Sequence, residues 1–283
     1  MLIIDGHVHI YDQFELSRFF VSAVANFAGA ARSLRAITYQ PVMFLADWPD
    51  KNWFETLRGL CQSAPAPGRG DLSGFFRFET TRERSSLIVK GKGLQPIVVI
   101  AARKIVTAEK LEVMALFSSE LFPMGSSLSD TLDLIRQHEA VAVIPWAVGK
   151  WLGRRGRRVN ALLNSHGHHV WLADNANRPW FWPRPRQFSH PDLGKSGLLA
   201  GSDPLDLASE VDRAGCFGFA IDGHIDDLFP ARQVKGYLCG NAGAVVRYGE
   251  LETGFRFVRN QVAIRLAKKA KEAMAGTPES HKR

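Results

Sequence analysis

The sequence predicts a single α/β domain folded as a distorted TIM-type barrel, and three observations favour this fold class. Short apolar runs alternate with segments of helical periodicity, which is typical of strands connected through helices. These runs are apolar on both faces, as expected for strands that are covered on each side. With 283 residues and a hydrophobic content of 46%, the chain can also build one core of barrel size.

The first half of the chain is predicted to begin with a strand that leads into a long helix. Phenylalanines recur at helical spacing within this helix and indicate the face that it buries. A loop is predicted at 63–70 from its alanine, proline and glycine content. The predicted elements are a strand at 2–8, a helix at 13–32, a strand within 35–46, a helix around 50–62 and strand-like runs at 75–79, 86–90, 96–101 and 111–117.

The second half continues the alternation of helices and strands. Its predicted elements are a helix at 127–138, a strand at 141–145, a helix near 157–165, strands at 170–173, 197–200 and 216–221, and an amphipathic helix at about 257–275. The stretch between the last strand and the last helix is irregular. Because no internal repeat is present, residues 1–283 are predicted to form one domain, with a basic helix and tail at about 257–283.

The composition narrows the location and the partners of the protein. No uninterrupted apolar stretch reaches 18 residues, so no membrane span is expected. The three cysteines are widely spaced and form no CxxC pattern, which favours a cytoplasmic protein. The net charge is +8, and the excess arginine and lysine residues are concentrated at 154–158 and in the tail. It is interpreted as a solvated surface rather than a nucleic-acid site, because no RNA- or DNA-binding motif accompanies it.

Two histidines one residue apart end the first predicted strand. In a strand, residues i and i+2 point to the same face, so the imidazoles of His7 and His9 can approach one ion. Imidazole is a common ligand for zinc, iron and manganese. The pair is therefore interpreted as a pair of metal ligands, with hydrogen-bonded polar residues at a strand end as the alternative.

Further ligand-type side chains lie in or directly after later apolar runs. The carboxyl ends of parallel barrel strands face one shared pocket, where such side chains gather. Glu112 lies inside an apolar run, where its charge needs a partner. The predicted metal ligands are His7, His9, Glu112, Asp174 and Asp203, and the predicted catalytic residues are Asp203, Lys150 and Arg154.

Two of these motifs resemble a known family. The start Asp5-Gly6-His7-Val8-His9 and the later Gly201-Ser202-Asp203 resemble the first and last metal motifs of PHP (polymerase and histidinol phosphatase) hydrolases. They are also similar to the amidohydrolases, whose barrels open with His-x-His and close with an Asp. This resemblance implies a divalent metal, which can be zinc, manganese or iron, and a bridging role for Glu112.

The sequence also departs from the PHP pattern. Leu205 stands where PHP proteins usually carry a further histidine after Gly-Ser-Asp. Trp146 follows Pro145 where a His-Pro strand end is expected, and no Thr-Asp-His motif follows the second strand. The departures argue against a complete trinuclear centre and leave room for one or two ions.

The chemistry implied by this arrangement is hydrolysis by a metal-activated water. Asp203 is the candidate general base, and Lys150 with Arg154 stabilises a phosphate or a developing oxyanion. The predicted substrate is a small anionic phosphoester, ester or amide. An alternative role for Lys150, implied by the amidohydrolase resemblance, is that of a carbamylated lysine that bridges two metals.

Several residues also have a structural interpretation. Glu112 can pair with Lys104 or Arg103, and Asp203 can cap a helix that begins after Pro204. Asp174 can be a turn residue. The aromatic and basic loop at 180–186 is either a lid over the barrel mouth or a structural packing element. His224 is kept as a possible late ligand.

Two other functions remain open at this point. A barrel that has lost its metal can serve as a binding or accessory protein, and the missing histidines favour this alternative. A nucleic-acid-associated protein that uses the basic tail is a third hypothesis.

Overall fold

The computed structural model describes residues 1–61, 75–166, 170–190, 193, 198–240 and 245–275. The predicted loop at 63–70, residue 197 of the predicted strand at 197–200, and the tail after residue 275 lie outside this part of the chain. None of the helices in the described part is both long enough and apolar enough to cross a membrane.

The described strands belong to one mixed sheet. They are β1 (Leu2–Val8), β2 (Gln40–Asp47), β3 (Phe76–Thr80), β4 (Ser86–Gly91), β5 (Ile97–Val106), β6 (Glu112–Leu116), β7 (Val141–Pro145), β8 (Val170–Asn175), β9 (Leu198–Gly201), β10 (Gly218–Ile221) and β11 (Val246–Tyr248). Their order is β11-β10-β1-β2-β5-β6-β7-β8-β9, and β3 and β4 form a hairpin that joins β5.

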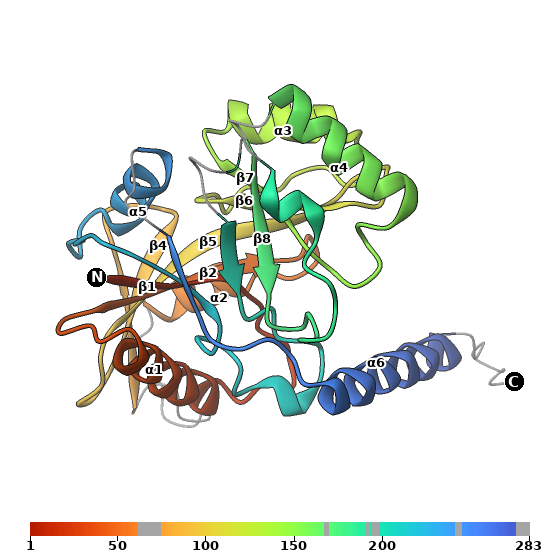
Figure 1. Cartoon of the computed structure of the whole chain (residues 1–283). Helices are drawn as coiled ribbons and strands as arrows, with labels where there is room; N and C mark the ends of the chain where they lie inside the picture. Colours follow the sequence, from red (N-terminus) through yellow and green to blue (C-terminus); the bar gives the residue numbers. More distant parts are fainter. Residues whose placement is uncertain (62–74, 167–169, 191–192, 194–197, 241–244, 276–283) are drawn as a thin grey trace, which may run out of the picture.

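Helices flank this sheet, as Figure 1 shows. They are α1 (Leu16–Ser33), α2 (Trp53–Leu60), α3 (Leu128–Gln137), α4 (Gly153–His166), α5 (Pro230–Cys239) and α6 (Gly254–Ala275), with short 3-10 turns at Arg186–Ser189 and Ala208–Glu210. Helices α1 and α2 pack on one outer side of the sheet, and α3 and α4 pack on another. Helix α5 packs against the inward-curving face.

The sheet nearly closes into a barrel because β9 returns to the side of β1. The Asp203 backbone N–H, just after β9, donates to the carbonyl of His7 at 2.8 Å. Gly201 packs against the His7 backbone so closely that a Cβ on Gly201 would lie 2.3 Å from the His7 nitrogen. The predicted α/β fold of distorted barrel type is therefore confirmed.

The barrel differs from a regular parallel one in the direction of several strands. The pairs β1–β2, β2–β5, β7–β8 and β8–β9 are parallel, as predicted. Strand β6 is antiparallel to both of its neighbours, and β10 is antiparallel to β1. The connection from β5 to β6 is too short for a crossover, so this pair folds back as a hairpin.

Alternation of side chains along the strands separates two apolar cores. In β1, Leu2 and Ile4 point to the inner core, and Ile3 points to the layer beneath α1 and α2. All three side chains are fully buried. This arrangement explains why the strand sequences are apolar at consecutive positions rather than at alternate ones.

The stretch between the last predicted strand and the last predicted helix was expected to be irregular, but it contains α5 and β11. Helix α5 begins with Pro230, and the Glu83 carboxylate accepts the N–H groups of Ala231 and Arg232 at 2.7 and 2.8 Å. This cap comes from almost 150 positions earlier in the chain, so no local pattern reveals it. Strand β11 has three residues and forms by pairing with β10.

The last helix extends away from the body of the molecule (Figure 1). Its first turn is attached through Arg256, which contacts the buried Glu210 at 2.9 Å and Glu252 at 3.6 Å. Asn260 also donates to Glu210. The helix presents an exposed apolar stripe to solvent: Phe255, Val258, Val262 and Leu266.

Candidate metal centre

The two histidines of the opening motif lie side by side at the end of β1. Their Nε2 atoms are 3.0 Å apart, and both side chains are buried. The Nδ1 atom of His9 lies 2.5 Å from the carbonyl oxygen of Ala46. Because a carbonyl only accepts, His9 carries its proton on Nδ1, which leaves a lone pair on Nε2. This is the tautomer that a metal-binding imidazole requires.

Asp203 completes the group from the other side of the barrel seam. Its Oδ1 lies 3.6 Å from His7 Nε2 and 3.4 Å from His9 Nε2. Its Oδ2 accepts a hydrogen bond from Asn175 at 3.0 Å, which directs Oδ1 toward the imidazoles. Asp203 has a φ of 46°, in the left-handed region that Asp tolerates better than most residues. The backbone is thus bent to aim this carboxylate.

A buried carboxylate in the opening strand holds the seam together. Asp5 is fully buried, and it accepts the N–H groups of His7, Ser202 and Gly215 at 3.2, 2.8 and 2.7 Å. Burial raises its pKa to about 7. Because Asp5 connects β1 to the residue before Asp203, it positions the Asp203 backbone beside the histidines. A charged residue within an apolar strand is a sequence signal for such a role, although no role was predicted for Asp5.

The environment sets the protonation of two of the candidate ligands, His7 and Asp203. Burial lowers the pKa of His7 to about 3. Burial by itself raises the pKa of Asp203, but the two imidazoles and Lys104 outweigh it and hold this pKa below its usual range. Near neutral pH, His7 is therefore a neutral imidazole and Asp203 is an ionised carboxylate. These are the forms in which both groups bind metals.

The donor set fits a divalent transition-metal ion. One ligand atom each from His7, His9 and Asp203 lies within 4.8 Å of the other two. Two imidazole nitrogens that face each other across 3.0 Å need either a shared proton or a cation between them. Nitrogen donors with one carboxylate oxygen suit zinc, manganese or iron, and the choice among them stays open.

Glu112 reaches the same mouth of the barrel by an unexpected route. It is the first residue of the antiparallel strand β6, and the start of this strand lies beside the end of β5. Its two oxygens lie 3.2 Å from Lys104 Nζ and 3.3 Å from Lys150 Nζ. Burial raises the pKa of Glu112, but the two ammonium groups outweigh burial and lower it overall. The predicted pairing with Lys104 is present, and the role as a bridging ligand stays a prediction.

Two other predicted site residues lie outside the histidine group. Asp174 is fully buried at the end of β8, where Arg178 contacts both of its oxygens at 2.8 and 2.6 Å. Arg247 also reaches Asp174, at 3.2 Å. Arg154 is exposed near the start of α4. Their roles as spare metal ligand and anion-binding residue stay predictions.

Loop 180–186 and His224 are placed by their neighbours. Trp182 contacts Trp146, which follows β7, and Phe181 contacts Phe257 of α6. The lid role of this loop stays a prediction. His224 follows β10, which runs antiparallel to β1 with Ile221 opposite Leu2. It therefore lies at the end of the barrel away from His9, and its assignment as a late ligand is wrong.

The surroundings of the group contain features that the sequence prediction missed. Lys104 is buried, and its ammonium lies 4.2 Å from the centre of the Trp48 ring. Trp48 in turn stacks on His9 with 6.1 Å between ring centres. A cavity of about 410 Å³ opens beside His9. The amide of Asn175 orients Asp203, a contact that the local sequence does not reveal.

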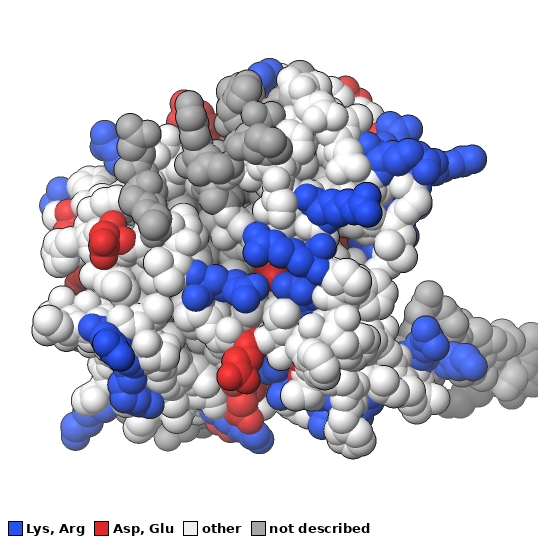
Figure 2. Space-filling model, in the orientation of Figure 1, with Lys and Arg blue, Asp and Glu red and all other residues white. Residues whose placement is uncertain are grey.

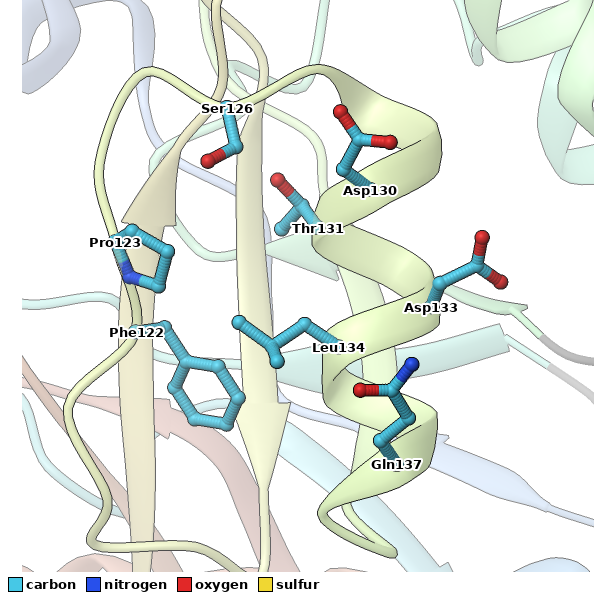
Figure 3. A pocket seen from close by; sticks show the side chains of 8 residues that line it. All are labelled: Phe122, Pro123, Ser126, Asp130, Thr131, Asp133, Leu134 and Gln137. Atoms are coloured by element: carbon cyan, nitrogen blue, oxygen red, sulfur yellow. The ribbon is translucent and has the colours of Figure 1, made fainter.

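Other surface features do not involve the histidine group. A second cavity of about 410 Å³ lies along α3, and Figure 3 shows Asp130, Asp133 and Gln137 on its helical wall. No residue that lines it belongs to the candidate metal centre. Figure 2 shows Lys and Arg side chains that gather in the middle of one face, over the β8 region.

Comparisons with known proteins support the fold but identify no family for this chain. No protein-family model matches the sequence, and no curated protein matches it. Among solved structures, PsfC from Pseudomonas syringae PB-5123 is similar with a TM-score of 0.51 and 14% identity, over 93% of this chain and 97% of PsfC.

Two endonuclease structures show a weaker likeness. The lesion-specific endonuclease PfuEndoQ from Pyrococcus furiosus has a TM-score of 0.48 and 12% identity, over 86% of this chain and 57% of the endonuclease. Endonuclease Q in complex with a 27-mer duplex that carries an abasic lesion has a TM-score of 0.45 and 11% identity, over 87% and 59%. At these identities, the comparison with PsfC supports the barrel-like α/β fold and assigns no activity.

Proposed function

We propose that this protein is a metal-dependent hydrolase in which His7, His9 and Asp203 hold a divalent ion. One observation carries the proposal: two buried imidazole nitrogens and a carboxylate oxygen converge within 3.0 to 3.6 Å. The hydrogen bond from His9 Nδ1 to the Ala46 carbonyl supports it, because it leaves Nε2 free to bind a metal. We also propose that the chain is related to the PHP hydrolases or amidohydrolases, which its sequence motifs resemble.

The residues around the centre have distinct roles in the proposed reaction. A bound zinc, manganese or iron ion supplies positive charge that makes a water molecule acidic enough to act near neutral pH. Asp203 accepts a hydrogen bond from the attacking water, as its predicted role as base requires. Asn175 holds the carboxylate in this orientation. Burial of His7 and His9 keeps competing bulk water away from the ligand atoms.

The proposed substrate is a small molecule with an anionic phosphoester, ester or amide group. Lys150 is one-third exposed and lies beside Glu112, which brings an ammonium group to the mouth of the barrel. It can contact the anionic group of a substrate or the charge that develops in the transition state. Arg154 extends this positive region in the proposal. These cations stabilise the negative charge that develops on the oxygen atoms of the attacked group during hydrolysis.

A metal-free binding or accessory protein is the second candidate. One specific observation favours it: the remaining predicted metal-ligand carboxylates already have cationic partners within the chain. Lys104 and Lys150 contact Glu112, and Arg178 contacts both oxygens of Asp174. If His7, His9 and Asp203 do not hold an ion, no second group of metal ligands is present in the described residues.

Metal content and hydrolysis distinguish the two candidates. Elemental analysis of the freshly purified protein is expected to show zinc, manganese or iron at about one ion per chain. Asp203→Asn should lose the ion, and hydrolysis of p-nitrophenyl phosphate, bis-p-nitrophenyl phosphate or p-nitrophenyl acetate should fall at least about 100-fold. Asp133→Asn, an exposed position on α3, is the matched control and should retain both.

The proposal fails if no transition metal is bound and none restores hydrolysis of any of these esters. It also fails if Asp203→Asn binds the ion with the affinity of the unaltered protein. Either result leaves the accessory function as the better candidate.

A further inference from the structure

The apolar stripe of α6 lies on a helix that projects from the body of the molecule (Figure 1). Phe255, Val258, Val262 and Leu266 form this stripe, and between 50% and 82% of each side chain is exposed. Exposed apolar side chains that gather in one place, rather than singly, are typical of interaction surfaces. Within the described part of the chain, nothing covers this stripe.

The first turns of α6 hold the helix in a fixed direction. Arg256 contacts Glu210 and Glu252, and the Phe257 ring contacts the Phe181 ring with 6.2 Å between their centres. At 3.6 residues per turn, Phe257 points to the side of the helix away from the apolar stripe. The body therefore holds one side of α6 and leaves the stripe open. A surface that is ordered before binding loses less entropy when a partner binds.

The width of the apolar stripe indicates what can cover it. Its members follow one another at spacings of three or four residues, and they span an arc of about 80° and a length of about 16 Å. A stripe this narrow is typical of the seam between two packed helices. Helices that lie in a membrane surface present a broader apolar face. The stripe therefore favours a helix of about three turns as its occupant.

Cations flank the apolar stripe on both sides. At 3.6 residues per turn, Arg265 lies on one side of it and Arg259 on the other, and both are exposed. Arg259 donates to the neutral amide oxygen of Asn260, which leaves its charge in place. The ion pairs that α6 forms with described residues are those of Arg256. Residues 254–271 contain no Asp or Glu, so the surroundings of the stripe are purely cationic.

This charge pattern selects among helical partners. The α6 helix of a second copy would bring the same arginines together, and like charges beside a helix seam oppose pairing. A helix with Asp or Glu on both sides of its own apolar seam would place a carboxylate opposite each arginine. The complementary occupant is therefore acidic.

We propose that α6 is a docking site for an acidic amphipathic helix of another protein. The apolar side chains of this partner cover the apolar stripe, and its carboxylates pair with Arg259 and Arg265. The proposal goes beyond the proposed hydrolase function and does not depend on the metal centre.

Three synthetic peptides of about three heptads test the proposal with the full-length protein. The first has leucine at the a and d positions and glutamate at e and g. The second has lysine in place of glutamate, and the third has the residues of the first in scrambled order. Fluorescence anisotropy should show that the first peptide binds with a dissociation constant of about 1–100 μM and the other two at least about tenfold more weakly. Binding of the first should weaken as the salt concentration rises.

Variants locate the binding on α6. The double variant Val262→Gln with Leu266→Gln keeps good helix formers and should weaken binding of the acidic peptide at least about tenfold. Arg265→Gln should weaken it about two- to fivefold and reduce its dependence on salt. Ile37→Gln, at a side chain that is 99% exposed elsewhere, and Arg136→Gln on α3 are the matched controls and should bind the peptide unchanged.

The other possible occupants give different results. If light scattering shows dimers that the double variant abolishes, a second copy covers the apolar stripe and the inference is overturned. If vesicles of phosphatidylcholine and phosphatidylglycerol bind the unaltered protein, the double variant loses that binding, and the acidic peptide does not compete, a membrane is the occupant and the inference is overturned. It is also overturned if the acidic peptide does not bind, binds no better than the lysine peptide, or binds the double variant as tightly as the unaltered protein. None of these results depends on metal content or ester hydrolysis, which are judged in their own assays.

Discussion

At the scale of single residues, the candidate centre depends on neighbours that orient its ligands. The Ala46 carbonyl sets the tautomer of His9, and the Asn175 amide directs one oxygen of Asp203 away from the histidines. A metal binds tightly only when its ligands are held in place before it arrives. The orienting groups should therefore matter almost as much as the ligands.

Substitution of Asn175 tests this dependence. Asn175→Ala removes the hydrogen bond to Asp203 Oδ2, so we expect metal affinity to fall by about 10- to 100-fold. Affinity is measured by competition with a chelating dye. Asn260→Ala removes another buried amide, which lies in α6 and donates a hydrogen bond to Glu210. This variant should leave metal affinity unchanged. Equal losses in the two variants would mean that the effect comes from general destabilisation.

The buried carboxyl of Asp47 predicts a pH dependence of stability. It accepts the N–H groups of Trp53 and Phe54 at the start of α2, and burial raises its pKa from 3.8 to about 7. The folded state therefore holds a proton that the unfolded state releases above about pH 4. Its contribution to the free energy of unfolding is complete below that pH and is lost as the pH rises to about 7.

Asp47→Asn separates this contribution from all others, because Asn does not titrate. Urea unfolding between pH 4 and pH 8 should show that the unaltered protein loses about 1–3 kcal/mol more than the variant as the pH rises. Asp133→Asn should follow the unaltered protein. Parallel pH curves for Asp47→Asn and the unaltered protein would contradict the raised pKa.

At the scale of elements, the seam between β1 and β9 brings the site together. Residues almost 200 positions apart meet there because Gly201 lets the two backbones approach closely. A side chain at this position would meet backbone atoms, which have no room to move aside. The Asp5 carboxylate adds the hydrogen bond to Ser202 that holds the approach in place.

Gly201→Ala is expected to open this seam. Its Cβ would lie 2.3 Å from the His7 nitrogen and 2.5 Å from the His7 Cβ, so we expect a loss of about 3 kcal/mol in unfolding free energy, together with weaker metal binding. Gly236→Ala in α5 is the control, because its Cβ meets nothing within 4 Å. That variant should be neutral or gain about 0.5–1 kcal/mol. Denaturant unfolding measures both, and equal stability of the two variants would refute the close packing at the seam.

At the scale of the whole molecule, a bound ion would join the two ends of the nearly closed sheet. Because His7 and His9 come from β1 and Asp203 follows β9, the ion would connect the first and last parts of the barrel seam. Metal binding should therefore appear as a change in the stability of the entire fold and not of one loop.

Thermal unfolding with and without metal checks this expectation. At free metal 100 times the dissociation constant, the ion should add about 2.7 kcal/mol, which corresponds to a rise in Tm of about 5 °C or more. EDTA should reverse the rise, and Asp203→Asn should show none. A rise of the same size in Asp203→Asn would place the ion at another site.

The local sequence was sufficient to predict most strands and the ligands at the start of the chain. Alternating apolar runs indicated the barrel, and the spacing of His7 and His9 placed both on one face. These features depend on neighbours within a few residues. Helix α5 was missed because its cap is Glu83, and the antiparallel direction of β6 was missed because an apolar run does not reveal which way its strand pairs.

By itself, therefore, the sequence determined an α/β barrel with a histidine pair at the end of its first strand, because side-chain alternation and apolar periodicity are local properties of the backbone. Only the tertiary structure decided that Asp203 meets that pair, that Glu112 lies between two lysines, and that Asp174 is held by arginines. Those contacts join residues from different strands, and their distances depend on how the strands pair and where the barrel closes.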